Sequence, residues 1–118
     1  MYVAGFVIPV PEDKLAAYRR WAEIGAALFR EYGCIEIVES FEDYIPSGKY
    51  TDFRRAVDAK DGEKIVFTWQ IWADKASLES AEAKMHEDNA LEVSGEIPFD
   101  PKRLIVGCFK PLHTMGRS

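Results

Sequence analysis

The chain has 118 residues, of which 47% are hydrophobic and 30% charged, and its formal net charge is -5. This length and composition predict one globular domain over residues 1–118, large enough to bury its own core. The negative charge disfavours nucleic acid as a partner, and the lack of an apolar run of about 20 residues or of a signal-like opening disfavours the membrane and favours the cytoplasm.

The first predicted elements are a strand and a long helix. Residues 2–8 form an apolar run that is typical of a strand. Pro11 suits the first turn of a helix, and Glu12 and Asp13 follow where the helix dipole favours acids. Gly33 is the expected stop of this helix. Its apolar positions recur at steps of three and four: Leu15, Tyr18, Ala22, Gly25, Phe29 and Tyr32.

The middle of the chain contains two further strands. Residues 34–41 predict the second strand, and residues 44–53 predict a loop because they contain proline, glycine and polar groups. The Asp61-Gly62 pair predicts a tight turn that leads into a strand over residues 65–72. The stretch 54–60 fits either a hairpin arm or a short helical turn, and the hairpin is favoured.

The last third of the chain predicts a second helix and a final strand. Asp74 is the expected N-cap of this helix, which ends near Asn89. Residues 92–102 are a connection, and residues 103–109 form the last strand. The apolar stripe of the helix consists of Leu78, Ala81 and Met85. The order βαββαβ is that of an α+β, ferredoxin-like fold, with an antiparallel sheet in strand order 4-1-3-2 and two helices on one face.

Both faces of the predicted sheet carry apolar residues, more than two helices can cover. Strand 65–72 has a uniformly apolar face, which should pack against the helices and consists of Ile65, Phe67, Trp69 and Ile71. Its other face is mixed and consists of Val66, Thr68, Gln70 and Trp72. Because large exposed apolar patches are rare on monomers, we expect a homodimer that associates through the mixed face; the alternative is a monomer with an open apolar face.

Motifs spread over nearly the whole chain carry a family resemblance. They lie at residues 5–11, 14–20, 48–49, 53, 55–57, 66–69, 83–85 and 98–103. Together they resemble the YbaA-like family of small bacterial proteins, which is placed in the dimeric α/β-barrel superfamily and has no settled activity. The resemblance implies the same ferredoxin-like fold and a homodimer, but it assigns no catalytic residue. Arg54 and Asn89 stand where that family often has proline.

The superfamily suggests two functional hypotheses. Its relatives include small monooxygenases, haem-degrading enzymes and isomerases, so the resemblance implies a cofactor-independent enzyme or a small-molecule binder with a cleft between sheet and helices. The alternative is a non-catalytic dimeric module for association or stress-related regulation. Haem is disfavoured: Trp69 and His86 have counterparts in haem-degrading relatives, but residues 2–8 contain no asparagine.

Polar residues on the mixed face are the first site candidates. Glu36 is a candidate base, since a carboxylate that points into the cavity between subunits would have its pKa raised by desolvation. The favoured interpretation of Glu36 is an ion pair with Arg54, Arg55 or Arg103. Thr68 and Gln70 are expected on the corresponding face, where they would bind a ligand by hydrogen bonds or bond each other across the dimer.

The remaining candidates are basic, aromatic or sulfur-containing. Arg54 or Arg55 is expected to hold a small anionic molecule or to pair with nearby acids. Four aromatic residues are candidates to line one pocket for an aromatic molecule, with packing in the core as the favoured alternative: Trp72, Trp69, Trp21 and Phe67. His86 is a weak candidate for a proton shuttle, because its helix face is charged. The two histidines lack metal-site spacing, so no metal is predicted. The two cysteines, Cys34 and Cys108, are predicted to be reduced and buried on opposite edge strands.

Overall fold

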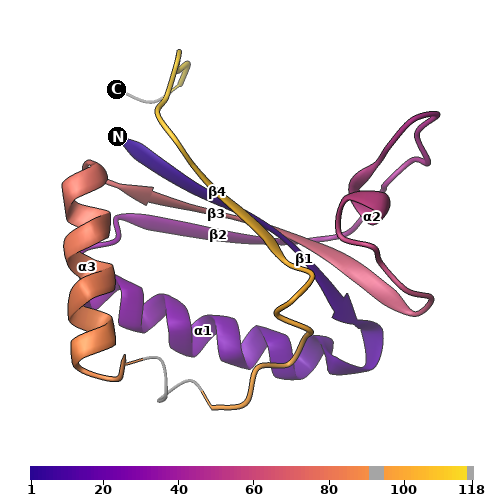
Figure 1. Ribbon diagram of the computed structural model, residues 1–118, viewed down its shortest axis with the longest axis horizontal. Helices are drawn as coiled ribbons and strands as arrows, with labels where there is room; N and C mark the ends of the chain where they lie inside the picture. The colour runs from indigo at the N-terminus through magenta and orange to yellow at the C-terminus, as the bar shows by residue number, and fades with distance from the viewer. Residues whose placement is uncertain (91–94, 117–118) are drawn as a thin grey trace.

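The computed structural model describes residues 1–90 and 95–116, in which four strands form one antiparallel sheet of order β2-β3-β1-β4 (Figure 1). This is the predicted ferredoxin-like order. The strands are β1 (Tyr2–Pro11), β2 (Glu36–Phe41), β3 (Glu63–Trp72) and β4 (Ile105–Phe109). The helices are η1 (Glu12–Lys14), α1 (Leu15–Glu31), α2 (Phe53–Ala56) and α3 (Lys75–Glu87). Helices α1 and α3 lie on one side of the sheet, and α2 lies at the end of the other side.

Strand β1 is longer than the predicted run over residues 2–8. It continues through Pro9 to Pro11, paired with β3, while the pairing with β4 extends only from Val3 to Val7. Beyond Val7 the second edge of β1 is therefore unpaired, and prolines are tolerated there because no ladder hydrogen bond is lost. Helix α1 then ends as predicted, with Gly33 in the left-handed region at φ +106°.

The segment before β3 forms a helix and not the favoured hairpin arm. The side chain of Asp52 accepts hydrogen bonds from the backbone N–H of Arg55 at 2.8 Å and of Gly48 at 3.2 Å. This local capping starts the short helix α2 and turns the chain away from an extended pairing. The predicted turn at Asp61-Gly62 is present, with Gly62 at φ +84°.

Helix α3 begins at the N-cap that the sequence predicts. Asp74 caps it, because its side chain accepts the backbone N–H of Ser77 at 2.7 Å. The predicted stripe of Leu78, Ala81 and Met85 is buried. The predicted connection over residues 92–102 lies partly outside the described residues; within it, Phe99 is buried against α1.

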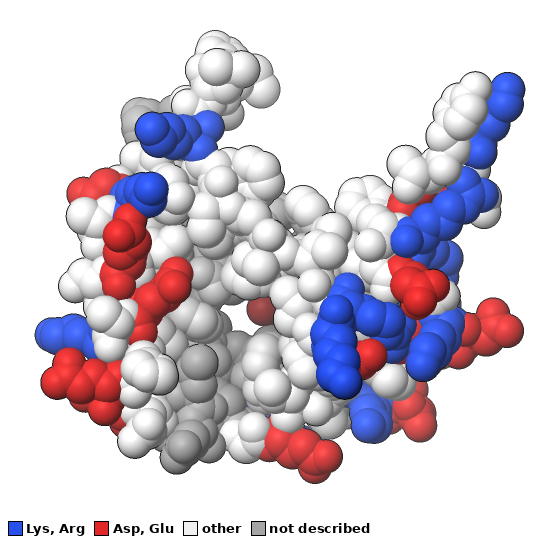
Figure 2. Space-filling model, viewed as in Figure 1, with Lys and Arg blue, Asp and Glu red and all other residues white. Residues whose placement is uncertain are grey.

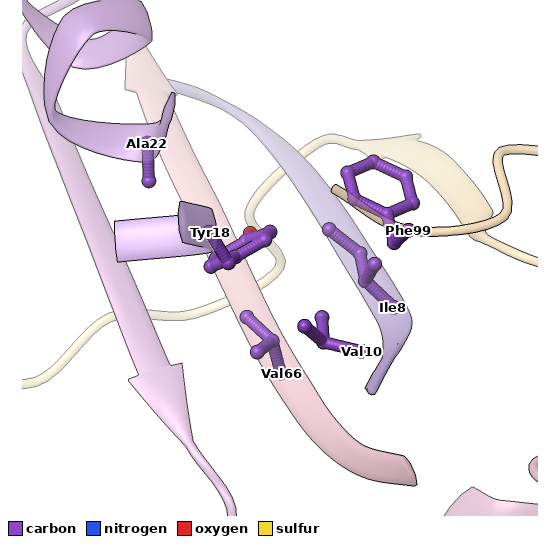
Figure 3. Packing of buried hydrophobic residues seen from close by; sticks show 6 residues of the cluster. All are labelled: Ile8, Val10, Tyr18, Ala22, Val66 and Phe99. Atoms are coloured by element: carbon purple, nitrogen blue, oxygen red, sulfur yellow. The ribbon is translucent and has the colours of Figure 1, made fainter. Parts of the chain in front are cut away.

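The helices cover the mixed face of β3, so the prediction that they would cover its uniformly apolar face was wrong. The main core cluster consists of Ile8, Val10, Tyr18, Ala22, Val66 and Phe99 (Figure 3). A second cluster contains Tyr2, Cys34, Trp72, Leu78 and Ala81. The register decides this outcome, since Val66 pairs with Ile8 and Trp72 with Tyr2, and β1 directs those partners towards the helices.

The uniformly apolar face is therefore the open one. Its apolar residues, together called the open face below, include Val3, Val38, Phe67, Trp69, Ile71, Ile105 and Phe109, and the polar residues Glu36 and Ser40 lie on the same side. Phe67 is 42% exposed and Phe109 is 59% exposed. At one end Val57 packs on Val7 and Ile65 and covers them. The two cysteines are free, and Cys34 is buried as predicted, but Cys108 is exposed because β4 is an edge strand with little covering it.

An ion-pair cluster joins the segment before β4 to the start of β3. The Arg103 guanidinium donates to both carboxylate oxygens of Glu63, at 2.7 and 2.6 Å, and to Asp100 at 3.0 Å. The Glu63 side chain is only 7% exposed and that of Arg103 only 15%. The hydrogen bonds from Arg103 hold the pKa of Glu63 below its ordinary value of 4.5.

We expect Arg103→Met to lower the free energy of unfolding by about 3 to 5 kcal/mol, because it leaves a buried carboxylate without its partner. A lowered pKa in the folded state stabilises the protein above the ordinary pKa of 4.5, and this contribution is lost as the pH falls below it. The acid dependence of stability should therefore be shallower in the variant. Urea denaturation at pH 7 and pH 4 measures both effects.

The matched control is Arg19→Met, which removes an ion pair with Glu23 whose two side chains are 85% and 68% exposed. We expect a change of about 0.5 kcal/mol or less. If the free energy of unfolding falls by the same small amount in both variants, the ion pair of Arg103 with Glu63 does not stabilise the fold.

Candidate functional site

A cleft of about 770 Å³ lies between α1 and the β2 side of the sheet. It is open because α1 presents the small side chains of Ala22 and Ala26 where it passes the edge strand. Figure 2, which views the molecule from the side of β4, shows a further hollow between the sheet and the helix layer at that edge. The apolar lining of the cleft consists of Leu15, Tyr18, Ala22, Ala26, Ile37, Phe41 and Val66, and the polar lining of Arg19, Glu23, Glu39 and Ser40.

A carboxylate is held in this cleft by two buried hydroxyl groups. The Tyr18 hydroxyl and the Thr68 hydroxyl each donate a hydrogen bond of 2.7 Å to Oε1 of Glu39. Tyr18 and Thr68 are buried, whereas Glu39 is exposed. The sheet register places Glu39 opposite Thr68, and Figure 3 shows Tyr18 extending from α1 towards the strands.

The phenol of Tyr18 is a hydrogen-bond donor at neutral pH. Burial raises its pKa most, and the negative charge of Glu39 raises it further, so the proton stays on Tyr18. The two donors fix the carboxylate through one oxygen and leave the group accessible from the cleft. A carboxylate so placed can accept a hydrogen bond or a proton from a bound molecule.

Glu39 was not among the residues predicted for the site. Its signal was present in the alternation of β2, where an acid stands between Ile37 and Phe41 on a face that is otherwise apolar. The partners Tyr18 and Thr68 lie 21 and 29 positions away, so the cluster itself is visible only in the folded chain.

The prediction that Glu36 shares a sheet face with Thr68 and Gln70 was wrong, because Glu36 lies on the opposite face. It accepts a hydrogen bond of 3.2 Å from Nε1 of Trp69 on the open face. Thr68 and Gln70 face the helices instead. The register explains the separation, because Glu36 pairs with Ile71 while Gln70 pairs with the next residue of β2.

Gln70 and Trp72 fill the core and are absent from the cleft lining. The Trp72 side chain is fully buried, and its Nε1 donates to Oε1 of Gln70 at 3.0 Å. Of the aromatic residues considered for one pocket, Trp72 and Trp21 lie on the helix side and Phe67 and Trp69 on the open face. They therefore do not line a common pocket.

The basic candidates and histidines lie away from the cleft. Arg54 pairs with Glu42 at 2.8 Å, and Arg55 lies 3.6 Å from Asp52, both at the α2 end of the molecule. His86 is exposed on α3. Within residues 1–90 and 95–116 no group of three or more His, Cys, Asp and Glu side chains is arranged to hold a metal ion. In that same part of the chain, no helix has the length and apolar character needed to span a bilayer.

The sequence matches a defined protein family. The family described as "Protein of unknown function (DUF1428)" matches residues 1–101. The uncharacterized protein YbaA of Escherichia coli strain K12 is 45% identical over 112 residues, which cover 94% of this chain and 96% of that protein. YbaA of Shigella flexneri matches with the same identity and coverage.

Solved structures share the fold at low sequence identity. A dimeric ferredoxin-like protein from an uncultured marine organism aligns with a TM-score of 0.56 at 8% identity, over 99% of this chain and all of that chain. The monooxygenase ActVA-Orf6 of Streptomyces coelicolor, in complex with nanaomycin D, aligns at 0.51 with 15% identity, over 99% and 92% of the two chains. SnoaB of Streptomyces nogalater, a cofactor-independent oxygenase, aligns at 0.50 with 15% identity, over 98% of both.

We expect Thr68→Val to lower the free energy of unfolding by about 1 to 2 kcal/mol, because it keeps the shape of a buried side chain but removes one donor to a charged group. Urea denaturation measures this loss. Thr51→Val, at an exposed threonine, is the control and should leave stability unchanged. If the two variants unfold alike, the Thr68 hydroxyl does not hold Glu39.

Proposed function

The chain belongs to the DUF1428 family, and we propose that it is a homodimeric protein that binds a small, mainly apolar molecule with a hydroxyl group in the cleft between α1 and the sheet. The observation that carries this proposal is the Glu39 carboxylate, held by Tyr18 and Thr68 in an apolar cleft. We place the protein in the cytoplasm, where its two free cysteines stay reduced.

The size and lining of the cleft suit a small organic ligand. A volume of about 770 Å³ lies within the usual range of ligand sites, which combine apolar walls with a few placed polar groups. Here the walls come from Leu15, Ala22 and Val66, and the placed group is Glu39. The donors on Tyr18 and Thr68 are already used, so the site offers the ligand an acceptor.

The charge of the cleft selects among ligand classes. Arg19, Glu23 and Glu39 line it, and Arg19 pairs with Glu23 at 3.0 Å, so the charge that remains is that of Glu39, which disfavours an anion. Arg54 and Arg55, the cations expected to hold an anion, are paired with Glu42 and Asp52. Of the two classes expected from the sequence, a neutral hydroxylated aromatic molecule therefore fits better than an anionic one.

A reaction at this site would begin with proton transfer. Glu39 is placed to take the proton of a bound hydroxyl group, and the hydrogen bonds from Tyr18 and Thr68 keep the carboxylate oriented. This chemistry needs no cofactor. Support comes from solved structures of the same fold, since SnoaB is a cofactor-independent oxygenase and ActVA-Orf6 was solved with nanaomycin D.

The open face supports the homodimer. Its apolar residues include Phe67, Ile105 and Phe109, which are 42%, 44% and 59% exposed. A second copy brings an identical apolar face, so a two-fold arrangement covers both at once. The same face favours the second candidate function, in which association itself is the role and the cleft carries no chemistry.

Binding of 1-naphthol and naphthalene tests the cleft. We expect the wild-type protein to bind 1-naphthol about tenfold more tightly than naphthalene, because the hydroxyl group donates to a charged acceptor. Glu39→Gln should abolish this difference, and Glu23→Gln, at the exposed rim, should keep it. Isothermal titration calorimetry gives the constants. Equal affinity of the wild type for both compounds would exclude Glu39 as the ligand's partner.

Phe67→Asp tests the dimer. The side chain is 42% exposed, so the monomer fold should tolerate the change, while a charge placed in the centre of an apolar interface should prevent association. We expect the wild type to sediment as a dimer and the variant as a monomer at micromolar concentration. A monomeric wild type would contradict the proposal.

A further inference from the structure

Two projections rise from the sheet on the side of the open face. The arm, residues 43–52, stands between β2 and α2, and the tail, residues 110–116, follows β4; they lie at opposite ends of the sheet (Figure 1). Ile45 of the arm packs against the cluster of Val57 and Ile65, but the other large apolar side chains of both projections are almost fully exposed. Tyr44 and Tyr50 on the arm are 79% and 84% exposed, and Leu112 and Met115 on the tail are 101% and 89% exposed.

The base of the arm is braced by charged groups. Both oxygens of Glu42 accept from the Arg54 guanidinium, at 2.9 and 2.8 Å, and one also accepts the backbone N–H of Ile65 at 2.9 Å. Arg54 reaches further and donates to the backbone oxygen of Glu63 at 2.9 Å. These bonds tie both ends of the arm to β3.

The turn of the arm is also fixed. Asp52 accepts the backbone N–H of Gly48 at 3.2 Å, which closes the turn. A side chain at Gly48 would come within 1.9 Å of the backbone oxygen of Thr51, so only glycine permits this close approach. An arm held in this way presents Tyr44 and Tyr50 in a set position, which lowers the entropic cost of binding.

We propose that the arm is a subunit clasp: Tyr44 and Tyr50 of one copy pack against the partner copy when the open faces meet, and Leu112 and Met115 of the tail form the contact at the other end. This inference rests on the homodimer proposed above. The arm and tail bound the open face at its two ends, so whatever covers that face lies between them.

A second copy fits as the occupant because it brings an identical apolar face and acidic groups that the basic tip of the arm can meet. Each chain carries a net charge of -5, whereas the tip of the arm carries Lys49, whose ammonium group lies 5.5 Å from the centre of the Tyr50 ring. Figure 2 shows basic side chains along this projection. Two copies of like net charge repel each other overall, so the attraction is local: the basic tip meets the acidic surface of the partner, and the apolar open faces of the two copies cover each other.

The double variant Tyr44→Ser/Tyr50→Ser tests the clasp by sedimentation equilibrium. We expect its dimer dissociation constant to rise about tenfold or more, because buried tyrosines are common binding hot spots. Ile24→Ser removes an apolar side chain that is 40% exposed on α1, in the other layer, and should leave the constant unchanged. Far-UV circular dichroism confirms that each variant is folded.

Arg54→Met tests the brace, with Arg54 as a positioning residue. It alters no side chain at the tip, yet it should raise the dissociation constant by several-fold, about the loss expected when a preorganised binding element becomes mobile. Its effect on the fold alone is read from urea denaturation in a Phe67→Asp background. A dissociation constant unchanged by Arg54→Met overturns the role of the brace.

The outcomes separate the clasp from the dimer itself. A wild type that is monomeric at all concentrations overturns both proposals. A wild-type dimer whose constant is unchanged by Tyr44→Ser/Tyr50→Ser overturns the clasp alone. As an independent check, benzoylphenylalanine in place of Tyr50 should give, on irradiation, a covalent species of twice the chain mass; its absence from a dimeric sample also overturns the clasp.

Discussion

The pairing register of β1 and β3 is the constraint on which the rest of the structure depends. It sets Val66 beside Ile8 and Trp72 beside Tyr2, and so decides which side chains of both strands face the helices. Because side chains alternate along a strand, a shift of one residue would exchange the two faces of β3 completely. The cleft, the core and the open face all follow from this one alignment.

The helices can cover the mixed face of β3 at little cost in free energy, because its polar side chains form hydrogen bonds there. The Thr68 hydroxyl donates to Glu39, and Gln70 accepts from the buried indole of Trp72. Buried polar groups cost little when they are hydrogen-bonded. The helix side therefore gains an oriented carboxylate at the rim of its core, while the mainly apolar surface stays open on the other side and is suited to association.

Ion pairs stabilise the α2 end of the molecule, where Arg54 and Arg55 were predicted to bind an anion. Arg54 braces the arm through Glu42, and Arg103 joins Glu63 to the segment before β4. These guanidinium groups are used within the chain, as expected for planar groups that bind carboxylates through two donors. The pair of Arg54 with Glu42 also gives the arm a fixed base, and so connects local electrostatics to the proposed contact between subunits.

The sequence by itself determined the elements, their order and several of their ends, because caps, turns and periodicity are local. Asp74 and Gly33 mark helix ends in this way. The favoured hairpin before β3 failed because the cap at Asp52 is stronger than the tendency to extend. Only the tertiary structure decided which sheet face the helices cover and that Glu39 meets Tyr18 and Thr68. The alternation of side chains along a strand shows which residues share a face. Which face of β3 the helices cover depends instead on the pairing and packing of segments far apart in the chain.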